Sequence, residues 1–307
     1  MAQMTWGILL AAYLFVGGMA GGAYIVGALA DIFGDSPFFP QKDKWKVLSR
    51  SGVYLSLISI ILGLVFLVLD LGRFEVNPLS PLNAYIHFPT SIMSLGTWII
   101  TAFTLVSLVT AVLWFFRGNS IIRKLIEIVG IILGGSTAAY TGLLLSFARG
   151  RPFWNTPFIP WTFIISGALT GLAMSLFLIP IIAVFMPRFF EDFKELVDRR
   201  EKYAQIIQDS QRYIMTLIVI ELVLVVLEMV IGHGAQLLSM AKLSLPFIIY
   251  LIAGLLAPLG IAYYCDRAEY VGRYSMLVPA SITSSILILI GGFFLRYVML
   301  MAGQIIP

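Results

Sequence analysis

Long apolar runs separated by short polar segments dominate this chain. A helix needs about 20 mostly apolar residues to cross a bilayer, and eight runs come close to or exceed that length. They are Trp6–Leu29, Val53–Asp70, Ile92–Phe116, Ile121–Phe147, Phe158–Phe185, Tyr213–Ile231, Pro246–Tyr264 and Leu277–Met301. Lipid gives an unpaired backbone group no hydrogen-bond partner, and no segment alternates like a barrel strand. The pattern therefore predicts an all-α polytopic membrane protein with eight transmembrane helices.

The first run contains a cluster of glycines. Gly17, Gly18, Gly21 and Gly22 place small residues three to five positions apart, which allows another helix backbone to approach closely. Helix packing is therefore the expected role of this face. Tyr13 lies one turn outward of it, and its hydroxyl needs a partner at that depth.

Composition excludes a soluble protein and several kinds of redox centre. Hydrophobic residues make up 60% of the 307 residues and charged residues only 12%. The single cysteine, Cys265, permits neither an intrachain disulfide nor a thiolate-ligated cluster within the chain. The only two histidines, His87 and His233, fall outside the runs or at their outer ends, which argues against a haem held by paired histidines. We expect no haem and no metal in this chain.

The basic residues indicate how the chain is oriented. Fifteen of the 20 Lys and Arg residues belong to the loops after the odd-numbered runs or to the flanks of those loops. Basic residues accumulate on the cytoplasmic side of membrane proteins. Both termini are therefore expected on the outer side of a prokaryotic inner membrane. The net charge of +4 reflects this asymmetry, and we infer no nucleic-acid partner from it.

A polar junction joins the fourth and fifth runs. The stretch 138–160 combines Tyr140 with two arginines, a tryptophan and an asparagine, and its three prolines end any helix there. Tyr140 precedes Arg149 by nine residues, about 13 Å along a helix. Such a junction could hold an amphipathic ligand that arrives from the lipid. An aromatic and cationic interface anchor explains the same spacing equally well.

Acidic residues near or within the runs are further candidates. Asp70 and Arg73 lie three residues apart at the outer end of the second run. Asp70 could be a proton-accepting carboxylate beside a site, or the two residues could form a surface ion pair. Glu221 and Glu228 lie on one face of the sixth run, two turns apart. Intramembrane carboxylates are functional candidates, although a neutral packing residue is the alternative. The apolar spacing of residues 188–212 suits an amphipathic surface helix, and we interpret this segment as a solvated cytoplasmic linker.

Five motifs together resemble the polysulfide reductase membrane subunit, or NrfD-like, family. The match runs from the first helix to the last, and RPFWNTP is its most specific part. The motifs are WGxxxAxYxFxGGxAGGA at 6–23, LDLGRF at 69–74, PTSxMSxGTW at 89–98, YTGLLLS…ARGRPFWNTP at 140–157 and RYVxxMAGQ at 296–304.

The resemblance implies a fold and a function. Members are haem-free, quinone-binding subunits with two four-helix bundles, here residues 1–147 and 158–307, joined by an outer-face junction at 148–157. They exchange electrons between a membrane quinone, here menaquinone or ubiquinone, and an outer-face iron–sulfur subunit. That ferredoxin-like, four-cluster subunit usually joins a molybdopterin-type catalytic subunit. The implied function is the quinone-reactive anchor of a respiratory oxidoreductase.

The resemblance also implies roles for individual residues. Tyr140 matches the family tyrosine that hydrogen-bonds a quinone carbonyl, while Tyr13 and Leu10 stand where the polysulfide reductase subunit has a histidine and an asparagine. Asp70, with Arg73 beside it, matches a glutamate at the start of a proton route. The remaining quinone-binding candidates come from the outer-face loops: His87, Arg151, Trp154 and Asn155.

Two other interpretations remain open at this point. Eight helices with buried carboxylates would also suit a proton-coupled secondary transporter. An anchor that binds no quinone is the third possibility. Co-purification with an iron–sulfur protein and extractable quinone supports the first interpretation, whereas isolation alone with substrate uptake in vesicles supports the second.

Overall fold

A computed structural model gives the fold of most of the chain. It describes residues 6–34, 42–70, 82–86, 88, 90–148, 150–151, 153–188, 190–231, 237, 241–267 and 274–305. All elements assigned within these ranges are helical. The part described contains eight helical segments long and apolar enough to cross a membrane, which confirms the predicted fold class.

The eight segments overlap all eight predicted runs, although α2 and α8 begin well before the runs that predicted them. The first four are α1 (Ile8–Gly34), α2 (Lys42–Asp70), α4 (Ile92–Phe115) and α5 (Ser120–Ser146). The fifth, sixth and eighth are α6 (Phe158–Phe185), α8 (Arg200–Ile231) and α12 (Tyr274–Ile305). The seventh combines α10 (Ala241–Ile249), the π-helical η2 (Tyr250–Leu256) and α11 (Ala257–Arg267). Two short helices, α3 (Asn83–Ile86) and α7 (Glu191–Asp198), lie between the long ones.

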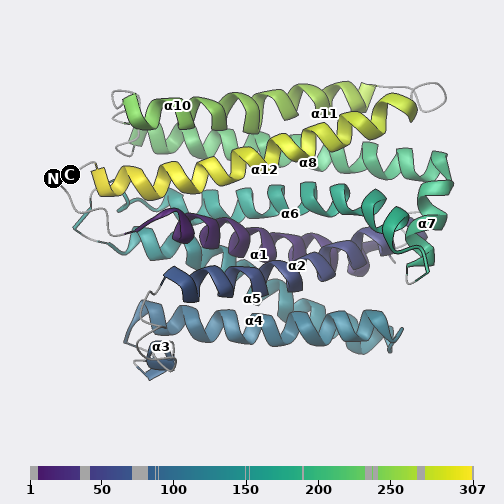
Figure 1. The fold of residues 1–307 in the computed structure, drawn as a ribbon, viewed down its shortest axis with the longest axis horizontal. Helices are drawn as coiled ribbons and strands as arrows, with labels where there is room; N and C mark the ends of the chain where they lie inside the picture. The colour runs from purple at the N-terminus through teal and green to yellow at the C-terminus, as the bar shows by residue number, and fades with distance from the viewer. Residues whose placement is uncertain are drawn as a thin grey trace.

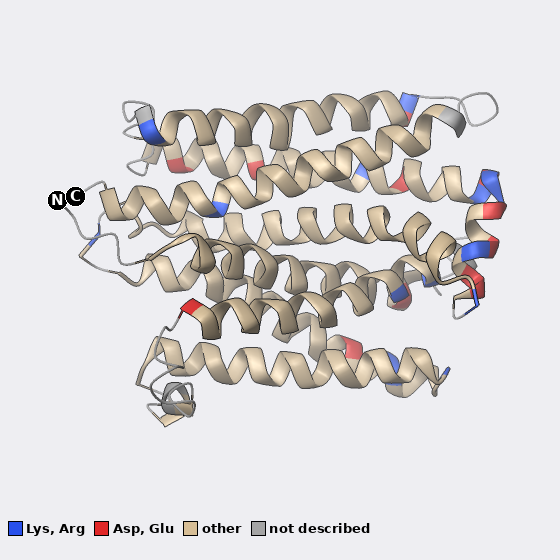
Figure 2. Ribbon diagram, in the orientation of Figure 1, with Lys and Arg blue, Asp and Glu red and all other residues tan. Residues whose placement is uncertain are grey.

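The long helices run side by side along one axis (Figure 1). Both chain ends lie at one end of the molecule, which we call the terminal end, and α7 lies at the other, the α7 end. Charged residues gather mainly towards the two ends, and the α7 end carries a dense group of both signs (Figure 2). This distribution suits helices whose central parts face lipid.

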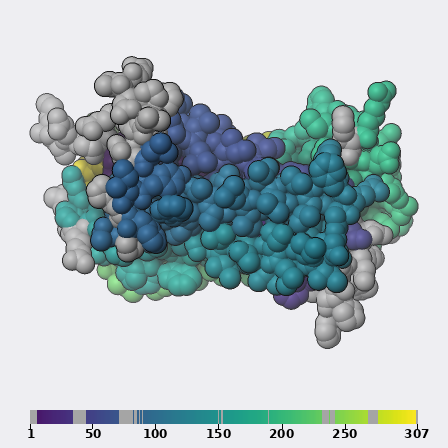
Figure 3. Space-filling model, turned by 90° about the horizontal axis from the view of Figure 1, so that it is seen from below, coloured from purple at the N-terminus to yellow at the C-terminus, as the bar shows by residue number. Residues whose placement is uncertain are grey.

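For description, we divide the long helices by chain order into two groups, which pack closely against each other. In the N-terminal group α1, α2, α4 and α5 pack together, and in the C-terminal group α6, α8, α10 to α11 and α12 do. Helices α1 and α6 join the groups, since each also contacts helices of the other. Figure 3 shows α4 and α5 forming the face seen from below, where exposed apolar side chains such as Leu105, Val109, Leu125 and Ile132 would meet lipid.

The glycines of α1 pack as predicted. A Cβ atom added to Gly21 would lie 2.3 Å from the carbonyl oxygen of Gly134 in α5. One added to Gly22 would lie 2.0 Å from that of Gly167 in α6. Only a glycine permits backbones this close, so the backbone of α1 packs directly against α5 of the N-terminal group and α6 of the C-terminal group.

The segment at 188–212 is largely helical and amphipathic, as expected, but its second half belongs to a long helix. Its first half forms α7, which buries Phe193 and Leu196. Its second half is already part of α8, with Ile207 and Gln211 buried. The helix starts early because α11 packs against this part of α8 and Gln208 donates to the carbonyl oxygen of Asp266 at 2.9 Å.

Candidate functional site

Two tyrosines from different helices meet near the terminal end of the N-terminal group. Tyr13 lies five residues into α1 and Tyr140 six residues before the end of α5, so both are about 8–9 Å in from the helix ends. Their side chains are only 1% and 5% exposed, respectively. Gly17 of α1 lies next to both Tyr13 and Thr141, the residue that follows Tyr140, so the two tyrosines come from packed parts of α1 and α5. The structure thus brings together the two residues expected to face one ligand.

Small residues surround these two rings. A Cβ atom added to Gly96 of α4 would lie 1.8 Å from Cζ of Tyr140, so the phenol rests directly on the α4 backbone. A Cβ added to Gly17 would lie 3.7 Å from Cε2 of Tyr13 and 3.8 Å from Cγ2 of Thr141. Gly63 of α2 faces the same edge of the Tyr13 ring, with a Cβ-to-Cδ2 distance of 3.7 Å. All four helices of the group therefore contribute to this place, which we call the tyrosine site.

The hydroxyls of the tyrosine site differ from those of Tyr24 and Tyr250, two other buried tyrosines. Neither the Tyr13 nor the Tyr140 hydroxyl bonds to another residue that the structure describes. In contrast, the Tyr24 hydroxyl pairs with that of Thr110 at 2.7 Å, and the Tyr250 hydroxyl donates to Glu221 at 2.9 Å. A buried phenol normally finds a partner. The tyrosine site thus offers two donors to an acceptor from outside the described chain.

The polar candidates next to this site are only partly described. Asp70 is the last residue of α2 at the terminal end, and its side chain is half-buried. Arg73 and His87, which we expected beside it, lie outside the described residues. Asp70 is therefore placed at the correct end of the N-terminal group, without a described contact to either tyrosine.

The junction between the two groups packs away from the tyrosine site. Trp154 is 3% exposed, donates from Nε1 to the carbonyl oxygen of Met299 at 2.7 Å and stacks on Trp6 with a centroid distance of 5.2 Å. Arg151 donates to the carbonyl oxygen of Gln304 at 3.3 Å, whereas Asn155 is exposed. In the structure, these contacts connect the N-terminal segment, the junction and the end of α12.

Glu228 also connects to the junction, since it accepts a hydrogen bond from Thr156 Oγ1 at 2.7 Å. Glu221 lies deeper and accepts from Tyr250. Arg296 of α12 is fully buried nearby, attracts Glu221 electrostatically and donates to Ser166 Oγ at 2.6 Å. We call Glu221, Tyr250, Arg296 and Ser166 the arginine cluster. It joins α6, α8, η2 and α12.

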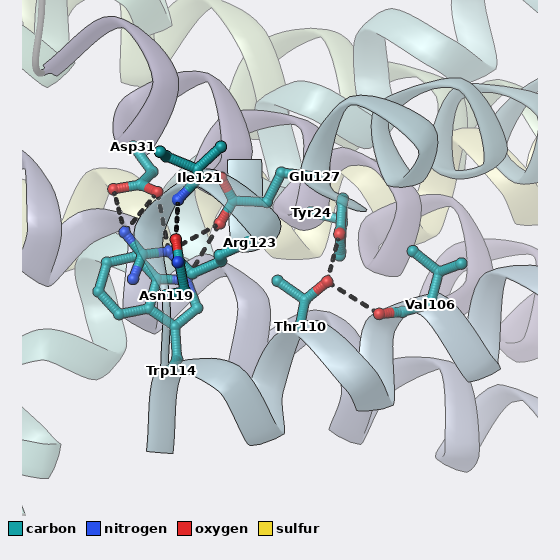
Figure 4. Close-up of polar contacts among 9 residues, drawn as sticks. All are labelled: Tyr24, Asp31, Val106, Thr110, Trp114, Asn119, Ile121, Arg123 and Glu127. Carbon is teal, nitrogen blue, oxygen red and sulfur yellow. Dashed lines mark hydrogen bonds and ion pairs between the residues drawn. The ribbon is translucent and has the colours of Figure 1, made fainter. Parts of the chain in front are cut away.

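A second buried ionic cluster was not recognised in the sequence. Arg123 donates from Nε and Nη2 to both carboxylate oxygens of Asp31, at 2.8–3.1 Å, and stacks over Trp114 with Cζ 3.8 Å from the ring centroid (Figure 4). Glu127 accepts from Trp114 Nε1 at 3.1 Å. The i, i+4 spacing of Arg123 and Glu127 was the available signal, but Asp31 lies 92 residues away in sequence. Arg123, counted above as a loop residue, is a buried residue of α5.

Comparison with known proteins agrees with the motifs. A profile of the family described as "Polysulphide reductase, NrfD" matches residues 1–307. The chain is 28% identical to "Protein NrfD homolog" of Haemophilus influenzae, over 99% of this chain and 95% of that protein. It is also 28% identical to one of the polypeptides of the polysulfide reductase of Wolinella succinogenes, over 56% of this chain and 57% of that one.

A more distant relative comes from an archaeon. The "Hdr-like menaquinol oxidoreductase integral membrane subunit" of Archaeoglobus fulgidus is 25% identical, over 57% of this chain and 41% of that protein. These relatives support a membrane subunit of a redox complex. Because the family profile matches the chain from its first residue to its last, this protein belongs to the polysulphide reductase NrfD family.

Proposed function

We propose that the tyrosine site binds a membrane quinone or quinol, and that the chain is the quinone-reactive subunit of a respiratory oxidoreductase. The observation that carries this proposal is the pair of buried phenols, Tyr13 and Tyr140, whose hydroxyls have no partner among the described residues. A quinone has carbonyl oxygens that accept such donors and a ring that fits between aromatic and glycine surfaces. The name of the archaeal relative, a menaquinol oxidoreductase subunit, agrees with this chemistry.

The described residues suit a flat, apolar ligand that bears carbonyl groups. Tyr13 and Tyr140 would hold and orient it by donating hydrogen bonds, each worth about 0.5–1.5 kcal/mol. The surface around the two rings includes Gly17, Gly63 and Gly96, which carry no side chain that would project towards a ligand. When bound, a quinone supplies two-electron, two-proton redox chemistry. Asp70, at the same end of the group, is the described carboxylate best placed to exchange protons with water.

Electrons have to reach this site from a partner protein. The sequence has one cysteine and two histidines, too few ligands for an iron–sulfur cluster or for two haems with paired histidines. We therefore propose an iron–sulfur subunit docked at the terminal end, followed by a molybdopterin-type catalytic subunit. Menaquinone and ubiquinone both fit the two-donor site.

We place the terminal end on the outer side of the inner membrane, following the distribution of basic residues. Lys194 in α7 and Lys242 in α10 are both exposed and lie in helices at opposite ends of the molecule. Two cysteine-free variants, each with a single lysine, are treated in intact cells with an amine reagent that cannot cross the membrane. The reagent should modify the variant that keeps Lys242 and spare the one that keeps Lys194. Labelling of both from one side would contradict the topology.

Replacing one phenol tests the proposed function directly. Tyr140→Phe removes a hydrogen-bond donor at nearly constant shape, so we expect quinone-linked turnover of the assembled complex to fall by about three- to tenfold. Dye-linked activity of the catalytic partner should stay unchanged. Tyr24→Phe is the matched control, because its hydroxyl bonds within the protein and its loss should leave quinone kinetics unchanged.

Wild-type quinone kinetics in Tyr140→Phe would remove this residue from the site. Isolation of the chain without redox partners, combined with substrate uptake in vesicles, would favour the transporter interpretation instead.

A further inference from the structure

A large apolar cavity lies between the two helix groups, away from the tyrosine site. Its volume is about 690 Å³, and its walls come from α1, α2, α6 and α8. Val26, Ala30 and Phe33 contribute from α1, Trp45 from α2, Ala168 from α6 and Leu217 from α8. On α1 and α2 the lining residues belong to the part of the helix nearest the α7 end. The cavity thus extends from the middle of the molecule towards that end.

The nature of the walls determines what can occupy this space. A buried water needs two to four polar partners, and the lining is almost wholly apolar. The hydroxyl of Thr216, one of its few polar groups, already donates to the carbonyl oxygen of Arg212 at 3.0 Å. Apolar walls that contact nothing lose dispersion energy. An apolar chain from the surrounding bilayer therefore suits the cavity, whose volume lies in the range of about 300–1,000 Å³ found for ligand pockets.

The rim at the α7 end adds a preference for one kind of lipid. Trp45 and Tyr213 line the cavity and contact each other edge to face with a centroid distance of 6.3 Å, as aromatic residues do at the headgroup level. Lys42, Lys44 and Lys46 flank Trp45 in the first turns of α2, with Asp43 as the one acid among them. This segment therefore carries a net charge of two, which attracts an anionic headgroup.

We propose that this cavity binds an acyl chain of an anionic phospholipid from the leaflet at the α7 end. The headgroup lies at the lysine-rich start of α2, and the chain extends between α1, α6 and α8. Because lipid tails are already in an apolar medium, selectivity comes from packing and from the headgroup charge rather than from hydrophobic transfer. The lipid would connect the two helix groups towards the α7 end, whereas the tyrosine site lies near the terminal end.

Lipid retention in the intact complex tests this proposal. The complex is purified in mild detergent from membranes containing phosphatidylglycerol and phosphatidylethanolamine, and bound lipids are counted by native mass spectrometry. We expect a tightly held phosphatidylglycerol on the wild type and its loss in Ala168→Phe, which fills the cavity. Val109→Phe adds the same ring to an exposed position on α4 and should leave lipid retention unchanged.

A second variant separates the headgroup from the chain. Replacing Lys42, Lys44 and Lys46 by Gln should reduce the preference for phosphatidylglycerol over phosphatidylethanolamine by about fivefold per lysine, equivalent to about 1 kcal/mol each. This readout does not depend on turnover. Equal lipid retention in wild type and Ala168→Phe, retention of a quinone in place of the phospholipid, or an unchanged headgroup preference in the lysine variant would overturn the proposal.

Discussion

Two buried polar sites, one in each helix group, differ in how their side chains are bonded. In the C-terminal group, Arg296 donates to Ser166 and to the carbonyl oxygen of Gly292, while Glu221 accepts from Tyr250. In the N-terminal group, the hydroxyls of Tyr13 and Tyr140 have no partner among the described residues, although both rings are buried. Both places lie within apolar helices, where an unpaired polar group is costly.

This contrast distinguishes a structural cluster from a binding site. Each member of the arginine cluster bonds within the protein, while Glu221 Oε2 and Arg296 Nε have no partner among the described residues. Because the cluster connects four elements, its main expected contribution is to the stability of the C-terminal group. The tyrosine site leaves two donors for an external acceptor. Glu221 and Glu228, functional candidates from the sequence, each bond to one described side chain and leave one carboxylate oxygen unpaired. Their functional role stays a prediction, and we consider the tyrosines the stronger candidates.

The largest expected effect is a loss of stability on changing the arginine cluster. Arg296→Met removes the buried cation that donates to Ser166 and to the carbonyl oxygen of Gly292. Leaving buried polar groups unpaired costs about 1–3 kcal/mol for each group, and more for a charged group such as Glu221. We expect a markedly lower thermal unfolding temperature and a low yield of folded protein. The double variant Arg296→Met with Glu221→Gln removes both charges and should recover much of the loss.

Quinone turnover in the same variants tests whether the arginine cluster is structural and the tyrosine site is the binding site. Complex that does assemble with Arg296→Met should reduce or oxidise quinone at a rate near that of the wild type. Normal stability combined with lost quinone turnover would instead place the arginine cluster in the reaction.

A second prediction compares two glycines that each face a tyrosine. Gly96→Ala would place a Cβ atom 1.8 Å from Cζ of Tyr140, and Gly130→Ala would place one 2.2 Å from Cε1 of Tyr24. Both substitutions force a ring to move, so each should destabilise the protein by about 1–3 kcal/mol. Only Gly96→Ala should also lower quinone turnover, by about tenfold or more, because a displacement of about 1 Å can cost about 100-fold. Equal turnover in the two variants would show that the position of Tyr140 is not important for the reaction.

The sequence predicted the helices well because their signal is local. Each membrane span is one apolar run, and the glycine face of α1 is visible within 6 residues, from Gly17 to Gly22. Pairings between distant helices gave no such signal. Asp31 and Arg123 are separated by 92 residues, and the contact of Gly96 with Tyr140 depends on how α4 packs against α5.

The candidate site was predicted only in part for the same reason. The motifs pointed to Tyr13 and Tyr140, and the structure places small residues of neighbouring helices against both rings. They also suggested Trp154, whose indole packs on Trp6 and bonds to α12, and its role in binding stays a prediction. A sequence motif marks a residue without showing where its side chain points, and an aromatic ring can serve a ligand or the packing between two helices equally well.

The smallest expected effect concerns proton exchange at the edge of the tyrosine site. Asp70 ends α2 at the terminal end and is only half-buried, so water can partly replace it as a proton acceptor. Asp70→Asn keeps the shape and hydrogen-bonding capacity of the side chain but cannot take up a proton. We expect quinone turnover to fall by about three- to tenfold, less than the about 100- to 10,000-fold that a sole general base contributes. Quinone occupancy of the purified complex should remain near the wild-type value, because both phenols are intact.

Asp198→Asn, at the exposed end of α7, is the control that should change neither quantity. Unchanged turnover in Asp70→Asn would reduce this carboxylate to a surface residue, whereas lost occupancy would make it a third contact to the quinone and extend the tyrosine site to the end of α2.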